Sequence, residues 1–283
     1  MTSPAYTGAV STARDYYNSS DADNFYFTIW GGEDIHIGLY KTDSASESIA
    51  AASRRTVEHL ISLLPPLSPQ TRILDIGAGY GGAARHLAKS YGCHVTALNL
   101  SEVENERNRS LSAAAGLDSL VEVMDGSFEQ LPFPDPSFDV VWSQDAILHS
   151  SNRQGVLQEV ARVLRPGGHF VFTDPMQANT CPEGVLQPIL DRIHLGSLGS
   201  PQFYEQAATD VGLQPLEFQD NTHQLVRHYR RVLQETTARA AEIQGLVSDA
   251  YQERMKKGLG HWIEGGEKGY LAWGFFHFQK PEG

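Results

Sequence analysis

Residues 72–82 have the sequence RILDIGAGYGG, in which a short apolar run passes directly into a glycine-rich turn. Gly77, Gly79 and Gly82 satisfy the spacing GxGxxG, which lets a backbone approach a ligand closely and adopt positive φ. Dinucleotide dehydrogenases share this spacing, and a tight strand–helix turn without a ligand is a second explanation. The segment therefore predicts a strand, a turn and a helix, and a ligand at the turn is the favoured interpretation.

Asp75 lies directly before these glycines, at the predicted end of the strand. A buried carboxylate fits poorly beside a pyrophosphate, but it suits a cation such as the ammonium group of a methionine moiety. An aspartate that only caps the glycine turn is the alternative. Asp75 thus favours a cationic ligand over a dinucleotide.

The segments on either side of the turn alternate between apolar strands and helices. Strands separated by helices form a parallel sheet with right-handed crossovers. The sequence therefore predicts an α/β fold with a doubly wound, seven-stranded, mostly parallel sheet whose last strand is antiparallel. Further strands are expected at 94–100, 120–126, 138–144, 168–174, 213–219 and 269–280, and helices at 46–64, 83–91, 102–115, 154–164, 201–211 and 222–255.

Three segments do not fit this alternation, and we expect them to form a mostly helical lid. Ligands of open α/β sheets bind at the carboxyl ends of the strands, where the strand order reverses, so a lid would lie there. The predicted division is an N-terminal lead-in (1–45), a ligand-binding core (46–175), a lid insertion (176–200), more core (201–220), a helical lid insertion (221–265) and the last core strand (266–283).

The composition restricts the partners of this chain. Its formal net charge of −12 argues against nucleic acid and anionic membranes, which repel an acidic protein. Cys93 and Cys181 are the only cysteines, too few for a disulfide framework, so a cytoplasmic location is expected. The histidines show no metal-ligand spacing, so we predict no metal. No apolar run reaches transmembrane length, and the oligomeric state stays open.

Five motifs resemble, in order and spacing, those of the class I S-adenosylmethionine-dependent methyltransferases, which have a Rossmann-like fold: DIGAGYGG, LNLS, DGSFEQLPF, FDVVWS and VLRPGG. The resemblance implies S-adenosyl-L-methionine as cofactor and S-adenosyl-L-homocysteine as its product. It places Gly77 and Gly79 beside the methionine part and Asp125 at the adenine amino group. The residues assigned to the cofactor are Asp75, Gly77, Gly79, Gly82, Asn99, Leu100, Asp125, Gly126, Ser127, Phe128 and Gln144.

Asn99 departs from the usual pattern of this class, which has an acidic residue at the end of the second strand to bind both ribose hydroxyls. An amide still accepts one hydrogen bond and donates another, so we expect Asn99 to be a neutral ribose ligand. An asparagine that only forms a turn is the alternative.

Seven segments resemble the sarcosine/dimethylglycine N-methyltransferases of glycine betaine synthesis: FYFTIWGGEDIHIGLY, LNLSEVENERNR, WSQDAILHS, FTDPMQ, CPEGVLQPILDRIHLGSLGSPQFY, THQLVRHYRRVLQE and GYLAWG. This resemblance extends over nearly the whole chain, including the predicted lid. It implies in-line methyl transfer to the neutral amine of dimethylglycine, and of sarcosine as a further substrate. An asparagine at the position of Asn99 also occurs in that family.

Such a reaction needs aromatic faces around the amine and a cation for the substrate carboxylate. Arg192 is the first choice for the carboxylate, with a surface pair to Asp191 or Glu183 as the alternative. The aromatic candidates could instead form a small core of their own, which is the favoured role of Trp142. The predicted catalytic residues are Tyr26 and His149, and the predicted substrate contacts are Tyr17, Trp30, His36, Trp142, Met176, Arg192 and His194.

Other functions stay open at this point. One is a class I methyltransferase acting on another small molecule, such as phosphoethanolamine or a natural product; the low Lys and Arg content of 176–200 argues against a phosphorylated substrate. Another is a nicotinamide dehydrogenase. Asp75 and the motif DGSFEQLPF argue against this function. The last is a catalytically inactive binding module with the same fold.

Overall fold

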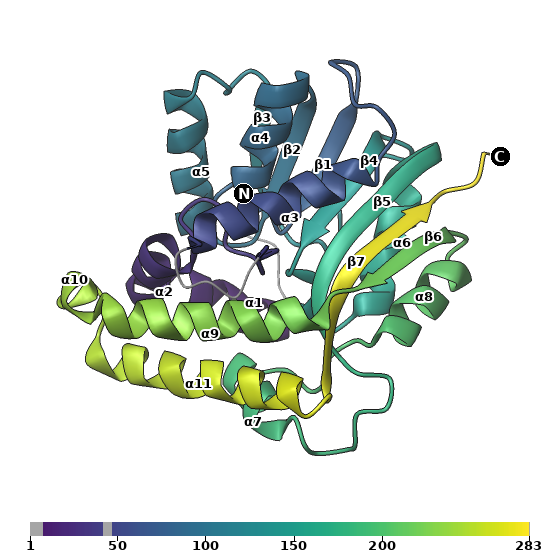
Figure 1. Cartoon of the computed structure of the whole chain (residues 1–283). Coiled ribbons are helices and arrows are strands. Elements are labelled where there is room, and N and C mark those ends of the chain that lie inside the picture. The colour runs from purple at the N-terminus through teal and green to yellow at the C-terminus, as the bar shows by residue number, and fades with distance from the viewer. Residues whose placement is uncertain (1–7, 42–46, 283) are drawn as a thin grey trace.

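One mixed sheet of seven strands organises the molecule (Figure 1). The computed structural model describes residues 8–41 and 47–282. The strand order is β3-β2-β1-β4-β5-β7-β6, and only β7 runs antiparallel to its neighbours, which confirms the predicted fold class. The strands are β1 (Arg72–Ile76), β2 (His94–Asn99), β3 (Val121–Asp125), β4 (Phe138–Gln144), β5 (Leu164–Gln177), β6 (Gln214–Asp220) and β7 (Leu271–Gln279).

Helices cover both faces of the sheet, and each face has its own hydrophobic core. Val57 and Leu87 belong to one core cluster, whereas Leu157 and Ala207 belong to the other. Central strands such as β1 and β4 are buried on both sides, so their apolar side chains contribute to both cores. The helices of these two layers are α3 (Ile49–Ser62), α4 (Gly82–Tyr91), α5 (Glu102–Ala114), α6 (Arg153–Val163) and α8 (Pro201–Asp210).

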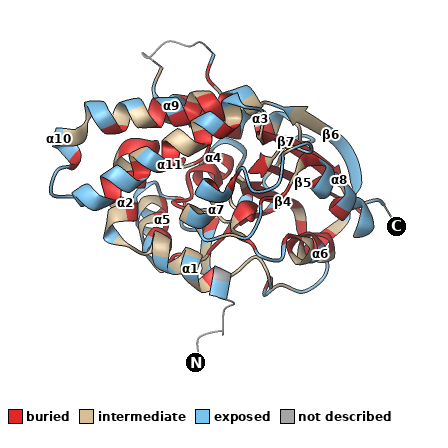
Figure 2. Cartoon of the chain, turned by 90° about the horizontal axis from the view of Figure 1, so that it is seen from below, coloured by how far each residue is buried: buried red, intermediate tan, exposed pale blue. Residues whose placement is uncertain are grey.

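The remaining helices form a cap beside the carboxyl ends of the parallel strands (Figure 1). In the cap, α9 and α11 lie side by side, and both carry buried as well as exposed residues (Figure 2). The members of the cap are α1 (Gly8–Tyr17), α2 (Ser20–Phe25), the π-helical turn η1 (Tyr26–Trp30), α7 (Gln187–Ile193), α9 (Thr222–Ala238), α10 (Ala240–Ile243) and α11 (Asp249–Glu267). Among the helices of the described residues, none is long and apolar enough to cross a membrane.

The structure corrects three expectations about secondary structure. The predicted helix 222–255 is wrong as a single element, because the chain turns between Ile243 and Asp249 and divides it into α9, α10 and α11. No individual helix was predicted within the lead-in, yet its described residues, 8–41, contain α1, α2 and η1; its residues 1–7 and 42–45 lie outside the described residues. The strand predicted at 168–174 extends over 164–177, so the expected loop does not begin at Met176.

Candidate active site

The first of two neighbouring cavities, the glycine-loop cavity, lies where the sheet order reverses between β1 and β4. Five predicted cofactor residues line it: Asp75, Gly77, Gly79, Gly82 and Gln144. The lead-in contributes its opposite wall, with Glu33, Asp34, Ile35 and His36. Of these four residues, only His36 was predicted from the sequence. The strap 33–40 between η1 and α3 therefore closes this cavity against the sheet.

Glycine is required at two positions of the loop for steric reasons. Gly77 has φ +80°, and a Cβ atom there would lie 2.3 Å from the Cβ of Ala146. At Gly82 a Cβ would lie 2.2 Å from Oδ1 of Asp34. The loop can therefore pass this close to its neighbours only without side chains at these positions.

Asp75 is buried at the end of β1, with 2% of its surface exposed. Burial, and secondarily the charge of Asp34, raises the pKa of Asp75 to about 7. The carboxylate is thus held in an environment that penalises its charge, and a bound cation would relieve the penalty. This agrees with the role that the sequence suggested for Asp75.

Asn99 has a partner that the sequence analysis missed. Its Nδ2 donates a hydrogen bond to Oε2 of Glu104, 2.8 Å away, and both side chains are buried. Burial raises the pKa of Glu104 to about 7 although the Asn99 hydrogen bond lowers it. An acidic side chain from the first turn of α5 therefore lies beside the end of β2. The signal was present in the sequence as the glutamate five residues after Asn99.

The other predicted cofactor residues lie in the segments after β2 and β3. Asp125 ends β3, and its carboxylate accepts hydrogen bonds from Nδ2 of Asn105 and Nη2 of Arg109, each at 2.8 Å. Phe128 approaches the glycine loop: its ring lies 3.7 Å from where a Cβ of Gly77 would be. Leu100, Gly126 and Ser127 belong to the same two connections.

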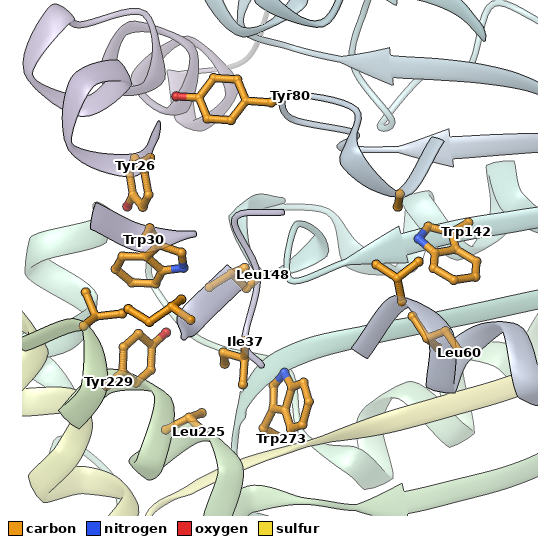
Figure 3. Packing of buried hydrophobic residues seen from close by; sticks show 14 of the residues in the cluster. Tyr26, Trp30, Ile37, Leu60, Tyr80, Trp142, Leu148, Leu225, Tyr229 and Trp273 are labelled. Atoms are coloured by element: carbon orange, nitrogen blue, oxygen red, sulfur yellow. The ribbon is translucent and has the colours of Figure 1, made fainter. Parts of the chain in front are cut away.

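The second cavity, the aromatic cavity, has a volume of about 90 Å³ and is enclosed mainly by the cap. Seven predicted residues line it: Tyr17, Tyr26, Trp30, His36, His149, Arg192 and His194. Three further rings in its wall, Tyr16, Tyr229 and Trp262, were not predicted. Figure 3 shows Tyr26, Trp30 and Tyr229 as neighbours; Trp30 lies 5.1 Å from Tyr26 and 5.7 Å from Tyr229 between ring centroids.

Trp142 and Met176, which were predicted to contact substrate, do not line this cavity. Both side chains are fully buried in the sheet. Trp142 packs near Leu60, away from Trp30 (Figure 3), and its Nε1 donates to Oε1 of Gln144 at 3.0 Å. We correct both assignments to core residues, since their side chains point into the layers between sheet and helices.

Arg192 lies between the tyrosines of the cap. It lines the aromatic cavity, and its Nη2 approaches Sδ of Met255 at 2.7 Å, a weak acceptor. Within the described part of the chain no carboxylate forms an ion pair with Arg192, which argues against the alternative pairs with Asp191 or Glu183. A partly buried guanidinium without a counter-charge is suited to an anionic group of a ligand.

Tyr17 and His149 are joined by a hydrogen bond of 2.9 Å between Oη and Nε2. Burial raises the pKa of Tyr17 well above its usual value, so the phenol keeps its proton. Burial, followed by the charges of Arg153 and Arg192, lowers the pKa of His149 to about 4. The imidazole is therefore neutral, and His149 is a weak base in this arrangement.

Comparison with known proteins decides which family this is. Residues 74–172 match the model of a methyltransferase domain. The chain is 61% identical over 272 residues to the sarcosine/dimethylglycine N-methyltransferase of Halorhodospira halochloris, covering 96% of this chain and 97% of that protein. It is 54% identical over 269 residues to the protein of the same name from Aphanothece halophytica, covering 95% and 96%. The chain belongs to the sarcosine/dimethylglycine N-methyltransferase family.

A solved structure supports the same family at the level of the fold. A methyltransferase from Galdieria sulphuraria, assigned as a sarcosine dimethylglycine methyltransferase, is 45% identical and superposes with a TM-score of 0.90, covering 95% of this chain and all of the other. As a member of this family, the chain is an S-adenosylmethionine-dependent N-methyltransferase.

Asp145 is a further residue of this N-methyltransferase that the sequence analysis missed. It follows β4 directly, has φ +51°, and lines the aromatic cavity. Its carboxylate accepts hydrogen bonds from the backbone N–H of Ile37 at 2.7 Å and from Nε1 of Trp273 at 2.8 Å. Asp145 thus fastens the strap of the lead-in to the sheet. Its position next to Gln144 was the only signal available in the sequence.

Proposed function

We propose that this protein transfers a methyl group from S-adenosyl-L-methionine to the nitrogen of N,N-dimethylglycine, and of sarcosine as a second substrate, so that glycine betaine is the final product. The observation that carries the proposal is the aromatic cavity, in which a guanidinium without a counter-charge lies among aromatic rings. A small amino acid with a methylated nitrogen presents the two groups, an anion and an alkylammonium, that these walls complement.

The aromatic rings would bind the amine end of the substrate. During transfer the nitrogen gains positive charge, and the face of an aromatic ring stabilises an alkylammonium by about 0.5–2 kcal/mol. Tyr26, Trp30 and Tyr229 are buried and adjacent. These rings would stabilise the transition state, in which the nitrogen carries positive charge, more than the neutral amine. This preferential stabilisation accelerates the reaction.

Arg192 would bind the carboxylate of the substrate. Its donors form a planar fork that matches a carboxylate in two hydrogen bonds. With the carboxylate fixed at one end and the nitrogen among the rings, the amine is oriented for in-line attack. Proximity and exclusion of water then contribute most of the rate enhancement, without a covalent intermediate on the protein.

The glycine-loop cavity would hold the methionine end of the methyl donor, whose sulfonium supplies the activated methyl group. We assign Asp75 to the ammonium group, and Asn99 with Glu104 to the ribose hydroxyls. Asp125 and Phe128 would contact the adenine. The raised pKa values of Asp75 and Glu104 support this assignment, since ligand groups would compensate both buried carboxylates.

Substitution Tyr17→Phe tests the role of the Tyr17–His149 contact. Removing the hydroxyl leaves the part-buried Nε2 of His149 without its hydrogen-bond partner at 2.9 Å, which costs about 1–3 kcal/mol unless the ring moves. We expect kcat for dimethylglycine to fall about 5- to 50-fold, while the Kd for S-adenosyl-L-homocysteine stays unchanged. Tyr91→Phe, at an exposed tyrosine, is the control. Unchanged kcat in Tyr17→Phe would exclude this contact from catalysis.

The proposed function is tested by product analysis. Purified protein is incubated with S-adenosyl-L-methionine and, in separate reactions, with glycine, sarcosine, dimethylglycine or phosphoethanolamine, and products are identified by mass spectrometry. We expect betaine from dimethylglycine and dimethylglycine from sarcosine. No methylation of either amino acid, with methylation of phosphoethanolamine, would overturn the assignment in favour of another small-molecule methyltransferase.

A further inference from the structure

His36 lies where the two cavities meet. Together with Ile35 it lines both the glycine-loop cavity and the aromatic cavity. The strap that carries it is fixed at the next residue, where the N–H of Ile37 donates to Asp145. The ring of His36 is thus held at the boundary between the binding regions for the methyl donor and for the acceptor.

The ring of His36 has no hydrogen-bond partner although it is buried. Only 7% of its surface is exposed, and neither Nδ1 nor Nε2 has a partner among the described residues. Burying polar atoms without partners is costly. In a binding site, such atoms indicate a ligand group that completes their hydrogen bonds.

Asp34 is a charged side chain close to this ring. Its Oδ1 lies 3.8 Å from Nε2 of His36, too far for a hydrogen bond but close enough for charge attraction, while Oδ2 pairs with Nη2 of Arg54 at 2.7 Å. Burial alone would raise the pKa of Asp34, yet His36 and Arg54 together lower it. The carboxylate is therefore ionised, and it lies beside a ring whose N–H can donate a hydrogen bond to a ligand.

The charges around the glycine-loop cavity show what such a donor would meet. Its charged side chains are Glu33, Asp34 and Asp75, and among its described lining residues only His36 can carry a positive charge. Glu33 is already paired with Arg85 at 2.7 Å, and Asp34 with Arg54. Asp75 is left for an ammonium group and His36 for an anion, and a free amino acid carries both.

We propose that His36 binds the α-carboxylate of the methionine moiety of the methyl donor through a hydrogen bond from its buried, unpartnered ring. The inference rests on the proposed function, because it assumes that the donor's amino-acid end occupies the glycine-loop cavity. Arg192 meanwhile serves the carboxylate of the acceptor. The two carboxylates are thus bound by different side chains on either side of the transferred methyl group.

The test compares two ligands that differ only in this carboxylate. Calorimetry measures the Kd of S-adenosyl-L-homocysteine and of its decarboxylated analogue, which keeps the amine, for the wild type, His36→Ala and His36→Gln. The wild type is expected to prefer S-adenosyl-L-homocysteine by about 10- to 100-fold. In His36→Ala the preference should fall to about threefold or less, whereas His36→Gln, which keeps one donor, should retain part of it.

His59→Ala serves as the matched control, since His59 lies in α3, bonds to Gln219 and lines neither cavity. The role of His36 would be overturned if His36→Ala kept the wild-type preference for S-adenosyl-L-homocysteine, or if it bound both ligands more weakly by the same factor. If His36→Ala does not fold, the same comparison with His36→Gln decides. If the wild type makes betaine and the His36 variants keep the preference for S-adenosyl-L-homocysteine, only this inference is overturned. If the wild type binds neither ligand, the proposed function is overturned.

Discussion

Replacing Arg192 with alanine is expected to raise the KM for dimethylglycine about 10- to 100-fold, because a charge-assisted hydrogen bond to a carboxylate is lost. The guanidinium has no ionic partner among the described residues, so its removal leaves no protein carboxylate uncompensated. The fold should therefore tolerate the change, and the Kd for S-adenosyl-L-homocysteine should stay within about twofold. Initial rates at varied dimethylglycine, with calorimetry for the cofactor product, measure the two effects separately.

Two variants show whether the geometry of the guanidinium matters. Arg192→Lys keeps the charge but loses the fork, so it should recover only part of the lost affinity. Arg254→Ala removes an exposed arginine of the neighbouring helix α11 and should leave KM unchanged. If Arg192→Ala has the KM of the wild type, the substrate carboxylate binds elsewhere.

Gly258 offers an independent way to move the same guanidinium. A Cβ atom at this position of α11 would lie 2.3 Å from Nε of Arg192. The arginine side chain therefore packs against α11 at a position that only a glycine leaves open. Gly258→Ala should therefore displace Arg192 and raise the KM for dimethylglycine in the same direction as Arg192→Ala, but less. Gly260, with no atom within 4 Å of its Cβ position, is the matched control.

Substitution Asp75→Asn is expected to raise the Kd for S-adenosyl-L-homocysteine about 10- to 100-fold, since the ammonium group loses a buried ionic partner. The pH dependence should change as well. With a pKa of about 7, Asp75 is protonated at pH 6 and ionised at pH 8, so wild-type affinity should increase over this range. In the Asp75→Asn variant the affinity for S-adenosyl-L-homocysteine should increase less between pH 6 and pH 8 than in the wild type. Calorimetry at several pH values measures this difference.

The same substitution has the opposite effect on the stability of the ligand-free protein. The pKa of Asp75 is about 7 in the folded chain and near the ordinary value of about 3.9 when unfolded. The folded state therefore holds the proton more tightly, and stability declines as the pH rises from about 4 to about 7. Asp75→Asn should consequently raise Tm at pH 8 while weakening ligand binding. Lower Tm together with unchanged Kd would mean that Asp75 only supports the glycine turn.

The sequence by itself determined the sheet and the glycine loop. Strands buried on both faces are rich in apolar residues, and a loop that passes within contact distance of Ala146 and Asp34 must use glycine, so both features are visible in local composition. Resemblance extended this to the family and to the residues that follow β2 and β3. The helices of the lead-in had no clear periodicity, because these short helices are stabilised by packing against the other helices of the cap rather than by their own pattern.

Only the tertiary structure decided which side chains share a cavity. Trp142 and Met176 lie in strands that are apolar on both faces, so alternation does not reveal which way a side chain points, and a shift of one residue reverses it. Tyr229 and Trp262 come from α9 and α11, far from the lead-in in sequence. Tyr229 meets Trp30, and Trp262 meets Tyr229, only because these helices pack beside η1. Local patterns specify a strand or a helix, but the docking of the cap specifies the substrate site.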